Sequence, residues 1–483
     1  MSEVRLELAN KLHIRIVTED RKYMIGIREY FTQHVEGFQY MPAWRSGSWD
    51  GKVCMINKMT NTIPYGLLFD YIRLHKKYFK NHKLVISKEV KQLFKGQKFV
   101  PRYNFSLKPY PYQKECIRAC LNYTKGIIRS ATASGKSLII SYLIKTLLDR
   151  KNSGVNNAII VVPNKQLVEQ FYSDMMKYGI DEDVIGRVYQ KYKQWDKPIT
   201  ISTWQTLKNN HDKLLLYDCL IVDECHGMKA HQLKTILKKS IAKYRFGFTG
   251  TLHASILDNW NTKSYIGPII KEFPSGFLAD KGFISKCNVN ILNLEYQQKK
   301  IKGTYDEVKD IVFNNPFRMN IIGKLCNKLD HNVLLLVGKV EKEGEVLEEY
   351  LKANTEKEVV FLSGRDDVDL REDWRKKMGE SKDILMIATY GIFQQGLNIP
   401  NLKYIMLIAP FKSKIRVLQS IGRSLRKHED KDTGAYIFDL HDHTNYFDKH
   451  GKIRYRYYDS EKFAINEYVY FEGDDIDLKE LII

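Results

Sequence analysis

The sequence contains no run of eighteen apolar residues among its 483, and so no segment long enough to cross a bilayer as a helix. Its start, MSEVRLELANKLHIRIV, carries charges throughout and does not resemble a secretory signal peptide. The seven cysteines are an odd number without a CxxC pair, and Cys116 and Cys120, four apart on an expected helix, predict core packing rather than a metal site. We therefore expect a reduced compartment, the cytoplasm, or the host cytoplasm if a phage encodes the protein.

The chain has fewer acidic than basic residues. The chain has 57 Asp and Glu against 77 Lys and Arg, a formal net charge of +20. The isoelectric point near 9.3 points to a polyanionic partner. An excess of lysine can also serve solubility alone, but a surplus of twenty charges makes that the weaker interpretation. Repeats and low-complexity tracts are absent, and 43% apolar residues suffice for packed domains.

The chain is too long for one ordinary core, and its length predicts about three domains. Residues 105–283 alternate apolar runs with helical stretches, which is typical of a parallel sheet covered by helices. The strands expected there are 126–128, 158–162, 199–201, 219–222 and 245–248. Residues 284–483 repeat the pattern, with strands expected at 333–337, 359–362, 384–388, 404–408 and 435–438 and a C-terminal helical extension. The prediction is α/β: two tandem parallel-sheet domains after a small α+β domain.

That small α+β domain is expected over residues 1–100. Strand-like alternation occurs at 4–8 and 12–17, and helical spacing at 19–35 and 67–82. A turn-rich segment carries Trp44 and Trp49, which are equally well explained as core residues or as exposed base-stacking groups. The stretch 73–98 holds nine Lys or Arg and one acid, interleaved with or next to Tyr71, Tyr78, Phe79 and Phe94. A charge run usually forms a solvated face, but these aromatics favour nucleic-acid contact.

A candidate phosphate-binding loop, Ser130-Ala-Thr-Ala-Ser-Gly-Lys-Ser137, separates the strand expected at 126–128 from a helical pattern at 138–148. This order fits a phosphate loop, although Ser130 replaces the glycine of the usual first position. Backbone N–H groups of small residues such as Ser134 and Gly135 would surround the phosphates at a helix N-terminus. Lys136 would reach the β- and γ-phosphates and Ser137 would ligand Mg²⁺, so ATP and Mg²⁺ are the expected cofactors.

The apolar run 219–222 ends in Asp223-Glu-Cys-His226. An apolar strand that delivers Asp-Glu at its carboxyl end is the metal-binding partner of a phosphate loop. Asp223 would hold Mg²⁺ and Glu224 would polarise the attacking water. A strand followed by an acidic turn is common, but a phosphate loop about ninety residues earlier makes the catalytic interpretation the stronger one.

Besides the phosphate loop and the acidic pair, further segments match the motifs of a superfamily 2 helicase in their order along the chain. Residues 105–445 therefore resemble a superfamily 2 helicase. The matching segments are Tyr112-Gln113 (the adenine-reading glutamine motif), Val162-Pro-Asn-Lys-Gln-Leu167 with Gln170 (motif Ia), Ser202-Thr-Trp-Gln-Thr206 (Ib), Thr249-Gly-Thr251 (III), Ala388-Thr-Tyr-Gly391 through Gly396-Leu-Asn-Ile-Pro400 (V), and Gln419-Ser-Ile-Gly-Arg423-Ser-Leu-Arg426 (VI). The resemblance implies two RecA-like motor domains with ATP in the cleft between them.

The resemblance also implies roles for single residues. Gln113 and Gln419 would bind nucleotide, and Arg423 and Arg426 would be catalytic arginines. Coupling of the ATP state to nucleic-acid grip is implied for Thr249, Gly250 and Thr251, and nucleic-acid contact for Pro163, Gln170, Thr203, Thr206, Thr389 and Asn398. The spacing of Gln419, Arg423 and Arg426 places them on one helix face, where arginine suits phosphate but also suits a surface ion pair.

A closer resemblance covers nearly the whole chain. RSGSWDGKVCMI and IPYGL in the N-terminal part, and the tail from Asn445-Tyr-Phe-Asp-Lys-His-Gly451 to Phe463, resemble the UvsW family of branched-DNA helicases from T-even phages. This implies an ATP-driven DNA helicase that regresses forks, migrates Holliday junctions and unwinds R-loops in recombination, repair and replication. Its partners would be branched or forked DNA, R-loops, and single-strand-binding or recombination proteins. We expect a monomer on DNA, no membrane association, and branch contacts by Trp44 and Trp49.

Three other functions stay open at this level. The motor subunit of a restriction complex shares these motifs, although no PD…(D/E)xK nuclease pattern stands out. An ATP-gated clamp that never translocates needs the same pocket. An RNA helicase would have to read the 2′-OH, and no residue clearly does so.

Overall fold

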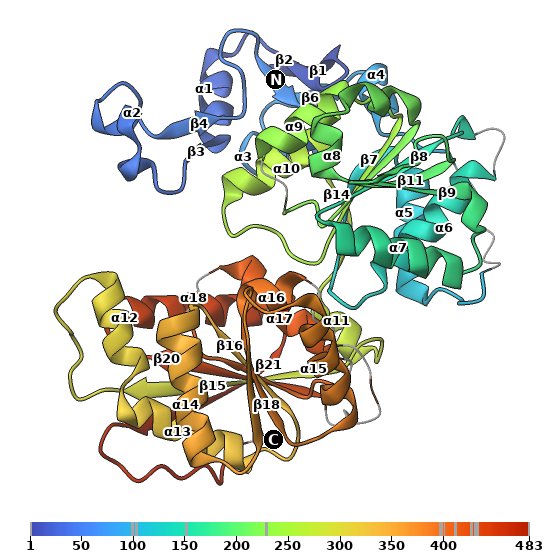
Figure 1. The fold of residues 1–483 in the computed structure, drawn as a ribbon. Helices are drawn as coiled ribbons and strands as arrows, with labels where there is room; N and C mark the ends of the chain where they lie inside the picture. Colours follow the sequence, from blue (N-terminus) through green and yellow to red (C-terminus); the bar gives the residue numbers. More distant parts are fainter. Residues whose placement is uncertain are drawn as a thin grey trace. The chain divides into compact units, whose positions relative to one another are not determined.

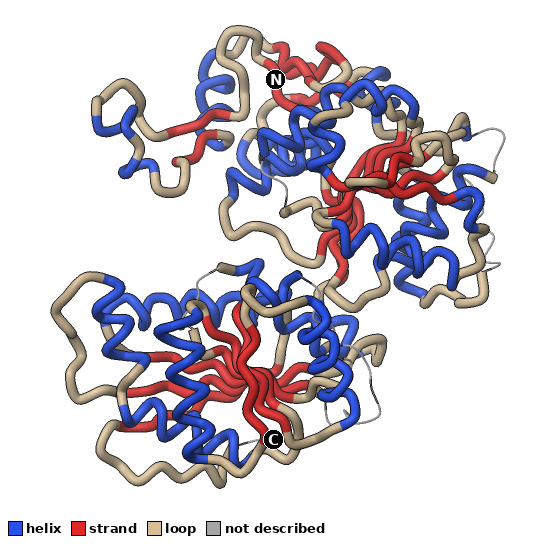
Figure 2. The backbone as a smooth tube through the Cα atoms, in the orientation of Figure 1, coloured by secondary structure: helices blue, strands red, loops and turns tan. Residues whose placement is uncertain are grey.

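The computed structural model describes residues 2–97, 101, 105–149, 153–227, 230–395, 399, 401–409, 413–425, 428 and 434–481. The chain divides into two compact units, residues 1–130 with 135–272, and residues 131–134 with 273–483. Each contains a mainly parallel sheet flanked by helices (Figures 1 and 2), so the predicted α/β fold is confirmed. Within these residues no helix combines the length and the apolar character needed to span a membrane.

The first unit begins with a four-stranded sheet in the order β5-β2-β1-β6. Its strands are β1 (Glu3–Asn10), β2 (His13–Val17), β5 (Thr62–Pro64) and β6 (Lys83–Ile86), with helices α1 (Arg21–Tyr30), α3 (Leu68–Tyr78) and α4 (Lys88–Leu93). A two-stranded ribbon, β3 (Thr32–His34) with β4 (Lys52–Cys54), carries the short helix α2 (Pro42–Arg45) between its strands. The helix expected over 19–35 therefore ends at Tyr30, because residues 32–34 pair with 52–54 instead.

The core of this N-terminal part continues into the larger sheet domain of the same unit. Tyr71 and Phe94 are buried in one hydrophobic cluster with Leu257 and Trp260 of helix α10 (Ile256–Ile266). Burial of Tyr71 and Phe94 argues against base stacking by these two aromatics of the lysine-rich stretch.

Polar contacts reinforce this junction. The Tyr65 hydroxyl donates to the carbonyls of Tyr265 (2.7 Å) and Ile266 (3.1 Å), and Lys263 Nζ lies 2.9 Å from Asp70 Oδ2. Residues 2–97 and the sheet domain beside them are consequently joined by a continuous core rather than by a flexible linker alone.

The larger sheet has eight strands in the order β10-β9-β11-β8-β12-β13-β7-β14. They are β7 (Lys125–Ser130), β8 (Ala158–Val162), β9 (Ile185–Tyr189), β10 (Tyr192–Lys193), β11 (Ile199–Thr203), β12 (Cys219–Asp223), β13 (Tyr244–Thr249) and β14 (Ile269–Phe273). The flanking helices are α5 (Pro111–Asn122), α6 (Lys136–Leu148), α7 (Lys165–Lys177), α8 (Trp204–Lys208) and α9 (Ala230–Lys239), besides α10. All five strands expected from apolar runs are confirmed, and every residue of β8 is buried, as in a parallel strand covered on both faces.

The second unit has a seven-stranded sheet in the order β17-β18-β16-β19-β20-β15-β21. Its strands are β15 (Cys287–Glu295), β16 (Val333–Val337), β17 (Glu358–Leu362), β18 (Ile384–Thr389), β19 (Tyr404–Leu407), β20 (Ala435–Asp442) and β21 (Ala464–Phe471). Its helices are α11 (Ser275–Asp280), α12 (Tyr305–Phe313), α13 (Pro316–Lys328), α14 (Val346–Asn354), α15 (Val368–Glu380), α16 (Tyr390–Gln395), α17 (Lys414–Ser424) and α18 (Asn445–Ser460). The five expected strands are again confirmed. The C-terminal extension is not helical alone, because β21 follows α18 and pairs in parallel with β15.

Candidate active site

The parallel strands of the first unit bring their carboxyl ends to one edge of the sheet, where ligands of such sheets usually bind. The phosphate loop follows β7, Asp223 ends β12 and Thr249 ends β13. Pro163 follows β8 and Thr203 ends β11. In the strand order β11-β8-β12-β13-β7, the expected nucleic-acid residues thus occupy one part of this edge and the expected nucleotide residues the other.

The phosphate loop has the backbone that its small residues permit. Ala133 (φ +66°) and Gly135 (φ +69°) are both left-handed, and Gly135 caps the N-terminus of α6. A Cβ at Gly135 would lie 2.6 Å from Gln113 Nε2, so a side chain there would displace the Gln113 amide. Gln113 is held there because its Oε1 accepts a hydrogen bond from the Tyr110 amide (2.8 Å). The Ser137 hydroxyl lies 2.9 Å from the Tyr178 hydroxyl.

Lys136, Asp223 and Glu224 meet at this edge. Lys136 Nζ lies 3.4 Å from Glu224 Oε1. Glu224 has a left-handed backbone (φ +45°), which is uncommon for a residue other than glycine and typical of functional turns. Asp223 is buried, and its Oδ1 accepts no hydrogen bond from the described residues. A buried carboxylate oxygen without a donor, close enough to Lys136 to feel its charge, fits a Mg²⁺ ligand.

The two carboxylates have opposite pKa shifts. Burial, together with the adjacent Glu224, raises the pKa of Asp223 against the opposing charge of Lys136. Burial would also raise the pKa of Glu224, but the charges of Lys136 and His226 outweigh it and lower that pKa. Glu224 is therefore held ionised, as a water-polarising base must be, and a divalent cation beside Asp223 would favour ionisation of that carboxyl too.

His226 is a site residue that we did not single out in the sequence. It is buried, with Nδ1 2.6 Å from the Thr249 hydroxyl and 3.3 Å from Glu224 Oε2. The Thr249 hydroxyl in turn lies 2.7 Å from the Thr251 carbonyl. His226 therefore connects the acidic pair to the Thr249-Gly250-Thr251 segment. The available signal was its position as fourth residue of Asp-Glu-Cys-His.

The expected nucleic-acid residues of the first unit differ in accessibility. Gln170 on α7 is exposed, and Thr206 and Pro163 are partly exposed. Thr203 is only 6% exposed, and its hydroxyl caps α8 through the Thr206 amide (3.4 Å). Gln205 Nε2 donates to the Pro163 carbonyl (3.1 Å), which ties the loop after β8 to α8. Thr203 thus has a structural task at this edge.

In the second unit, Thr389 ends β18 and is partly exposed, and Gln419 lies on α17. The helix expected for motif VI is therefore present. Arg423 belongs to α17, but its side chain lies outside the described residues, as do Asn398 and Arg426 altogether.

The two tryptophans of the N-terminal part are not core residues. Trp44 on α2 is 40% exposed. Trp49 is partly buried, and its Nε1 donates to the Lys52 carbonyl (2.9 Å). Trp44 is therefore accessible, whereas the Trp49 ring is held against the ribbon, and contact of either ring with bases stays a prediction.

Three protein families match successive segments of the chain. They are described as "DNA helicase UvsW, N-terminal" (residues 3–87), "Type III restriction enzyme, res subunit" (106–254) and "Helicase conserved C-terminal domain" (318–428). The ATP-dependent DNA helicase uvsW of Enterobacteria phage T4 is 27% identical over 501 aligned residues, covering 95% of this chain and 98% of that protein.

Solved structures give two further comparisons. A crystal structure of T4 UvsW aligns over 97% of this chain and 99% of its own, with 25% identity and a TM-score of 0.48. A fragment assigned to the HsdR subunit of a type I restriction enzyme from Vibrio vulnificus covers 77% of this chain and 70% of its own, with 16% identity and a TM-score of 0.58. At that identity the second likeness concerns the fold alone. From the family matches and the end-to-end similarity to T4 UvsW, the chain belongs to the superfamily 2 helicases and carries the N-terminal domain of the UvsW DNA helicases.

Proposed function

We propose that this ATP-dependent DNA helicase remodels branched DNA, by regressing forks, migrating Holliday junctions and unwinding R-loops in phage recombination, repair and replication. The observation that carries the proposal is an exposed aromatic and basic ribbon, β3 to β4, joined through a shared core to the ATP-binding sheet. Such an arrangement would let a branch-contacting surface move together with the motor.

The chemistry proposed for the first unit is hydrolysis of the γ-phosphate. Lys136 would neutralise charge on the β- and γ-phosphates, and Glu224, ionised and 3.4 Å from Lys136, would orient and deprotonate the attacking water. Ser134 and Gly135 would contribute backbone N–H groups to the phosphates, and Gln113 would read adenine. Mg²⁺ held by Asp223 and Ser137 would supply further charge neutralisation.

Completion of the site is proposed to come from the second unit. Gln419, Arg423 and Arg426 would contact the nucleotide from motif VI, with the arginines stabilising charge in the transition state. The helical state of residues 414–424, which places Gln419 and Arg423 one turn apart, supports this role for these two residues. Thr249, Gly250 and Thr251 would then pass the nucleotide state to the strand-gripping residues Pro163, Gln170, Thr203, Thr206, Thr389 and Asn398.

The ribbon supplies the chemistry expected of a branch-contacting surface. Tyr40 is 77% exposed and Trp44 is 40% exposed, so both rings are accessible to unpaired bases. A hollow of about 500 Å³ between α1 and the ribbon is lined by Arg28, Lys52 and Lys58 among others, with Glu29 as its acidic residue. The excess of positive charge suits a backbone phosphate beside the stacked base.

Deleting the N-terminal part is a poor test, because its loss would expose the buried Leu257 and Trp260 of helix α10. Single substitutions on the ribbon avoid this difficulty. Trp44→Ala removes one exposed ring, and Lys52→Gln with Lys58→Gln removes two charges of the hollow. Phe471→Ala, on β21 with a 54% exposed ring, is the matched control.

The experiment compares ATPase stimulation and binding with single strand, linear duplex, fork, Holliday junction and R-loop. The wild type should prefer branched DNA. Trp44→Ala should weaken binding to branched DNA by about 1–3 kcal/mol, the usual value of one stacked base, and leave linear duplex unaffected. The double lysine variant should reduce the salt dependence of binding by about one to two counterions.

Equal stimulation of the wild type by all five DNAs would contradict branch specificity. Retention of the branch preference by both ribbon variants would move recognition elsewhere. Base pairs opened per ATP hydrolysed distinguish a translocating motor from an ATP-gated clamp, and a clamp would open none beyond its binding site.

A further inference from the structure

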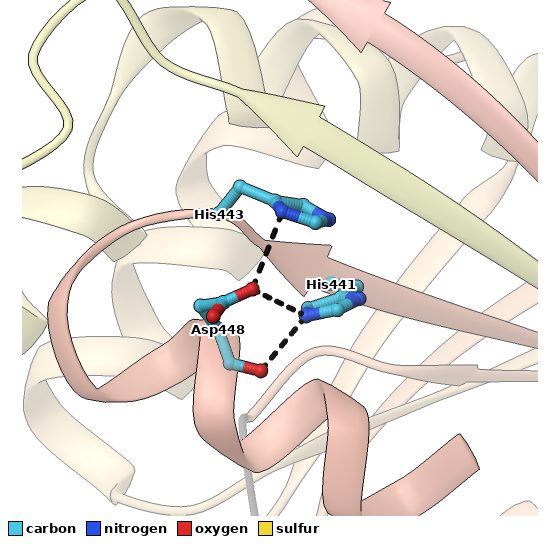
Figure 3. A group of neighbouring side chains, drawn as sticks. All are labelled: His441, His443 and Asp448. Carbon is cyan, nitrogen blue, oxygen red and sulfur yellow. Dashed lines mark hydrogen bonds and ion pairs between the residues drawn. The ribbon is translucent and has the colours of Figure 1, made fainter.

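A cluster of two histidines and an aspartate lies at the carboxyl end of β20, outside the nucleotide site. His441 is in β20, His443 is the first residue after that strand, and Asp448 is in the first turn of α18 (Figure 3). One ligand atom from each lies within 4.8 Å of the others. None of these residues has a part in the ATPase chemistry described above.

The two separations between Asp448 and the histidines are those of metal ligands. Asp448 Oδ1 lies 3.3 Å from His443 Nδ1 and 3.5 Å from His441 Nε2. Two ligands of a tetrahedral Zn²⁺ ion, each about 2.1 Å from the metal, are about 3.4 Å apart. Asp448 Oδ1 is buried and accepts no hydrogen bond from the described residues, although its second oxygen pairs with Lys452 (2.7 Å).

A neighbouring amide orients His443. His443 Nε2 lies 2.9 Å from Asn293 Oδ1 on β15. An amide oxygen only accepts, so Nε2 carries a proton, and in the neutral imidazole Nδ1 is then the nitrogen with the lone pair that a metal would bind. This is how a carbonyl or carboxylate commonly fixes the tautomer of a metal-binding histidine.

The backbone holds His441 equally firmly. Asn293 on β15 is paired with His441 in the parallel ladder, and a Cβ at Gly451 would lie 1.9 Å from the His441 ring, so only glycine fits beneath it. His441 Nε2 now lies 3.0 Å from the Asp448 carbonyl and would give up this hydrogen bond to a metal.

A second carboxylate lies beside the cluster. Glu295 Oε1, at the end of β15, is 3.4 Å from His443 Nδ1. Two neutral imidazoles and two carboxylates would balance the charge of a divalent ion. Imidazole with carboxylate suits Zn²⁺, whereas Mg²⁺ and Ca²⁺ prefer oxygen ligands throughout.

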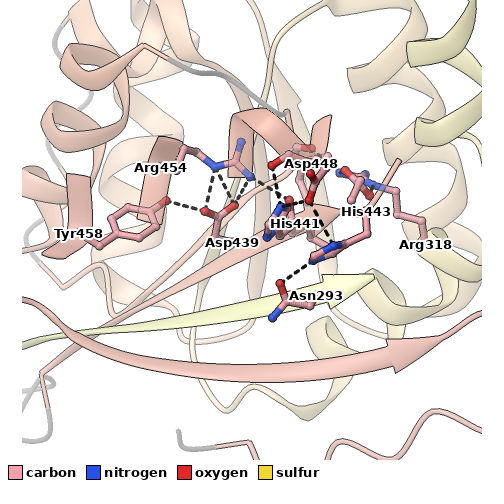
Figure 4. A network of polar contacts seen from close by, with 11 residues as sticks. Asn293, Arg318, Asp439, His441, His443, Asp448, Arg454 and Tyr458 are labelled. Carbon is pink, nitrogen blue, oxygen red and sulfur yellow. Dashed lines mark hydrogen bonds and ion pairs between the residues drawn. The ribbon is translucent and has the colours of Figure 1, made fainter. Parts of the chain in front are cut away.

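We propose that His441, His443 and Asp448 bind a Zn²⁺ ion, with Glu295 or water as the fourth ligand. The ion joins the end of β20 and the adjacent β15 to the first turn of α18. Farther along α18, Arg454 binds Asp439 through two nitrogens (2.7 and 2.8 Å) and Tyr458 donates to the same carboxylate (2.7 Å) (Figure 4). The metal would thus fix the beginning of a helix whose later turns are already held by a buried ion pair.

The competing explanation needs no metal. A protonated His443 between Asp448 and Glu295 would satisfy both carboxylates with its Nδ1 proton alone. This alternative predicts a protein that binds zinc no more tightly than its scattered surface histidines do.

The test uses untagged full-length protein without nucleotide, equilibrated with Zn²⁺ and then with a chromophoric chelator as competitor. One Zn²⁺ per chain should remain bound, and the melting temperature should rise with Zn²⁺ concentration. Asp448→Asn and His443→Asn should each abolish stoichiometric binding, and Asn293→Ala should weaken it by about 10–100-fold. His331→Asn, which alters a histidine near Asp330 in the same unit, should leave binding unchanged.

A second measurement does not depend on how the variants fold. Co²⁺ added to the wild type should give the intense visible absorption of a four-coordinate site, displaced by one equivalent of Zn²⁺. A weak octahedral spectrum, or Co²⁺ that one equivalent of Zn²⁺ fails to displace, would overturn the proposal and leave the protonated network.

Discussion

His226 Nδ1 and the Thr249 hydroxyl are 2.6 Å apart in a buried position, the histidine at the turn after β12 and the threonine at the end of β13. The same histidine nitrogen is 3.3 Å from Glu224 Oε2. We therefore expect a change in the position or charge of Glu224 on hydrolysis to reach Thr249 through His226. This contact adds a side-chain connection to the backbone hydrogen bond that Glu224 accepts directly from Gly250 of the expected coupling segment.

Breaking this contact should uncouple hydrolysis from DNA. We expect His226→Ala to lose about tenfold of its DNA stimulation, since a broken buried hydrogen bond costs about 1–3 kcal/mol. Basal ATPase activity should fall less, because Lys136 still lowers the pKa of Glu224. Steady-state ATPase rates with and without DNA measure this. Thr249→Val should act similarly, and the double variant should be no worse than either single one if the two residues act as a pair. Additive losses would contradict direct coupling.

Glu224 should be needed for hydrolysis rather than for binding. Glu224→Gln keeps the shape but cannot accept the proton of water, so turnover should fall by about 10²–10⁴-fold with ATP affinity nearly intact. Lys136→Ala should abolish turnover and weaken ATP binding as well, because phosphate neutralisation is lost. Fluorescent-nucleotide binding and single-turnover hydrolysis separate the two effects. Near-normal turnover of Glu224→Gln would refute its role as base.

The arginines of motif VI should act mainly in the transition state. We expect Arg426→Ala to lower kcat by about 10³-fold or more while ATP binding changes far less, as for other arginine fingers. Nucleotide titration and steady-state kinetics on the same preparation give both quantities. A parallel loss of binding and rate would indicate that Arg426 has a structural task instead.

Gly66 sets the distance between the N-terminal part and α10. A Cβ at this position would lie 1.7 Å from the Lys263 carbonyl oxygen, which belongs to the backbone and cannot rotate away. Gly66→Ala should therefore destabilise the first unit by about 1–3 kcal/mol and increase proteolysis near this junction. Gly364→Ala, with nothing within 4 Å of its Cβ position, is the control. Equal thermal stability of both variants would mean that the junction is loosely packed in solution.

Lys125 is a buried cation at the same junction, with its amine 4.9 Å from the centre of the Tyr65 ring. Burial, followed by the charges of Arg245 and Lys11, lowers the pKa of Lys125 to about 8. Below about pH 8 the amine is charged in both the folded and the unfolded state, and burial of this charge lowers the stability of the folded state by its full amount. As pH rises from about 8 towards the unfolded value of 10.5, the unfolded chain binds more protons and the wild type gains stability.

Lys125→Met should accordingly stabilise the protein at pH 7 by about 1–3 kcal/mol, and the advantage should shrink by pH 10. Thermal denaturation of both proteins across this range measures the difference. Lys243→Met is the control, because Lys243 also lies over a tyrosine ring (5.2 Å) but is exposed. An advantage that grows with pH would contradict the lowered pKa.

The sequence by itself determined the strands of both large sheets and the order of the helicase motifs. Runs such as Ala158–Val162 and Val333–Val337 are apolar throughout because both faces of a central parallel strand are buried. The phosphate loop is equally local: its left-handed Gly135 and the helix after it follow from neighbouring residues. Such features are encoded within a few residues and need no knowledge of distant contacts.

Only the tertiary structure decided which aromatics are buried and which polar groups meet. In the sequence, Tyr71, Phe94 and Trp44 are all aromatics in the basic N-terminal part and candidates for base contact. Only Tyr71 and Phe94 belong to the buried cluster of Trp260, about 170 to 190 residues away along the chain. The approach of Glu295 and Asn293 to His443 likewise depends on the pairing of β15 with β20, which are separated by about 140 residues. Periodicity reports that a face is buried but not what covers it, because the covering surface comes from residues that no local pattern can specify.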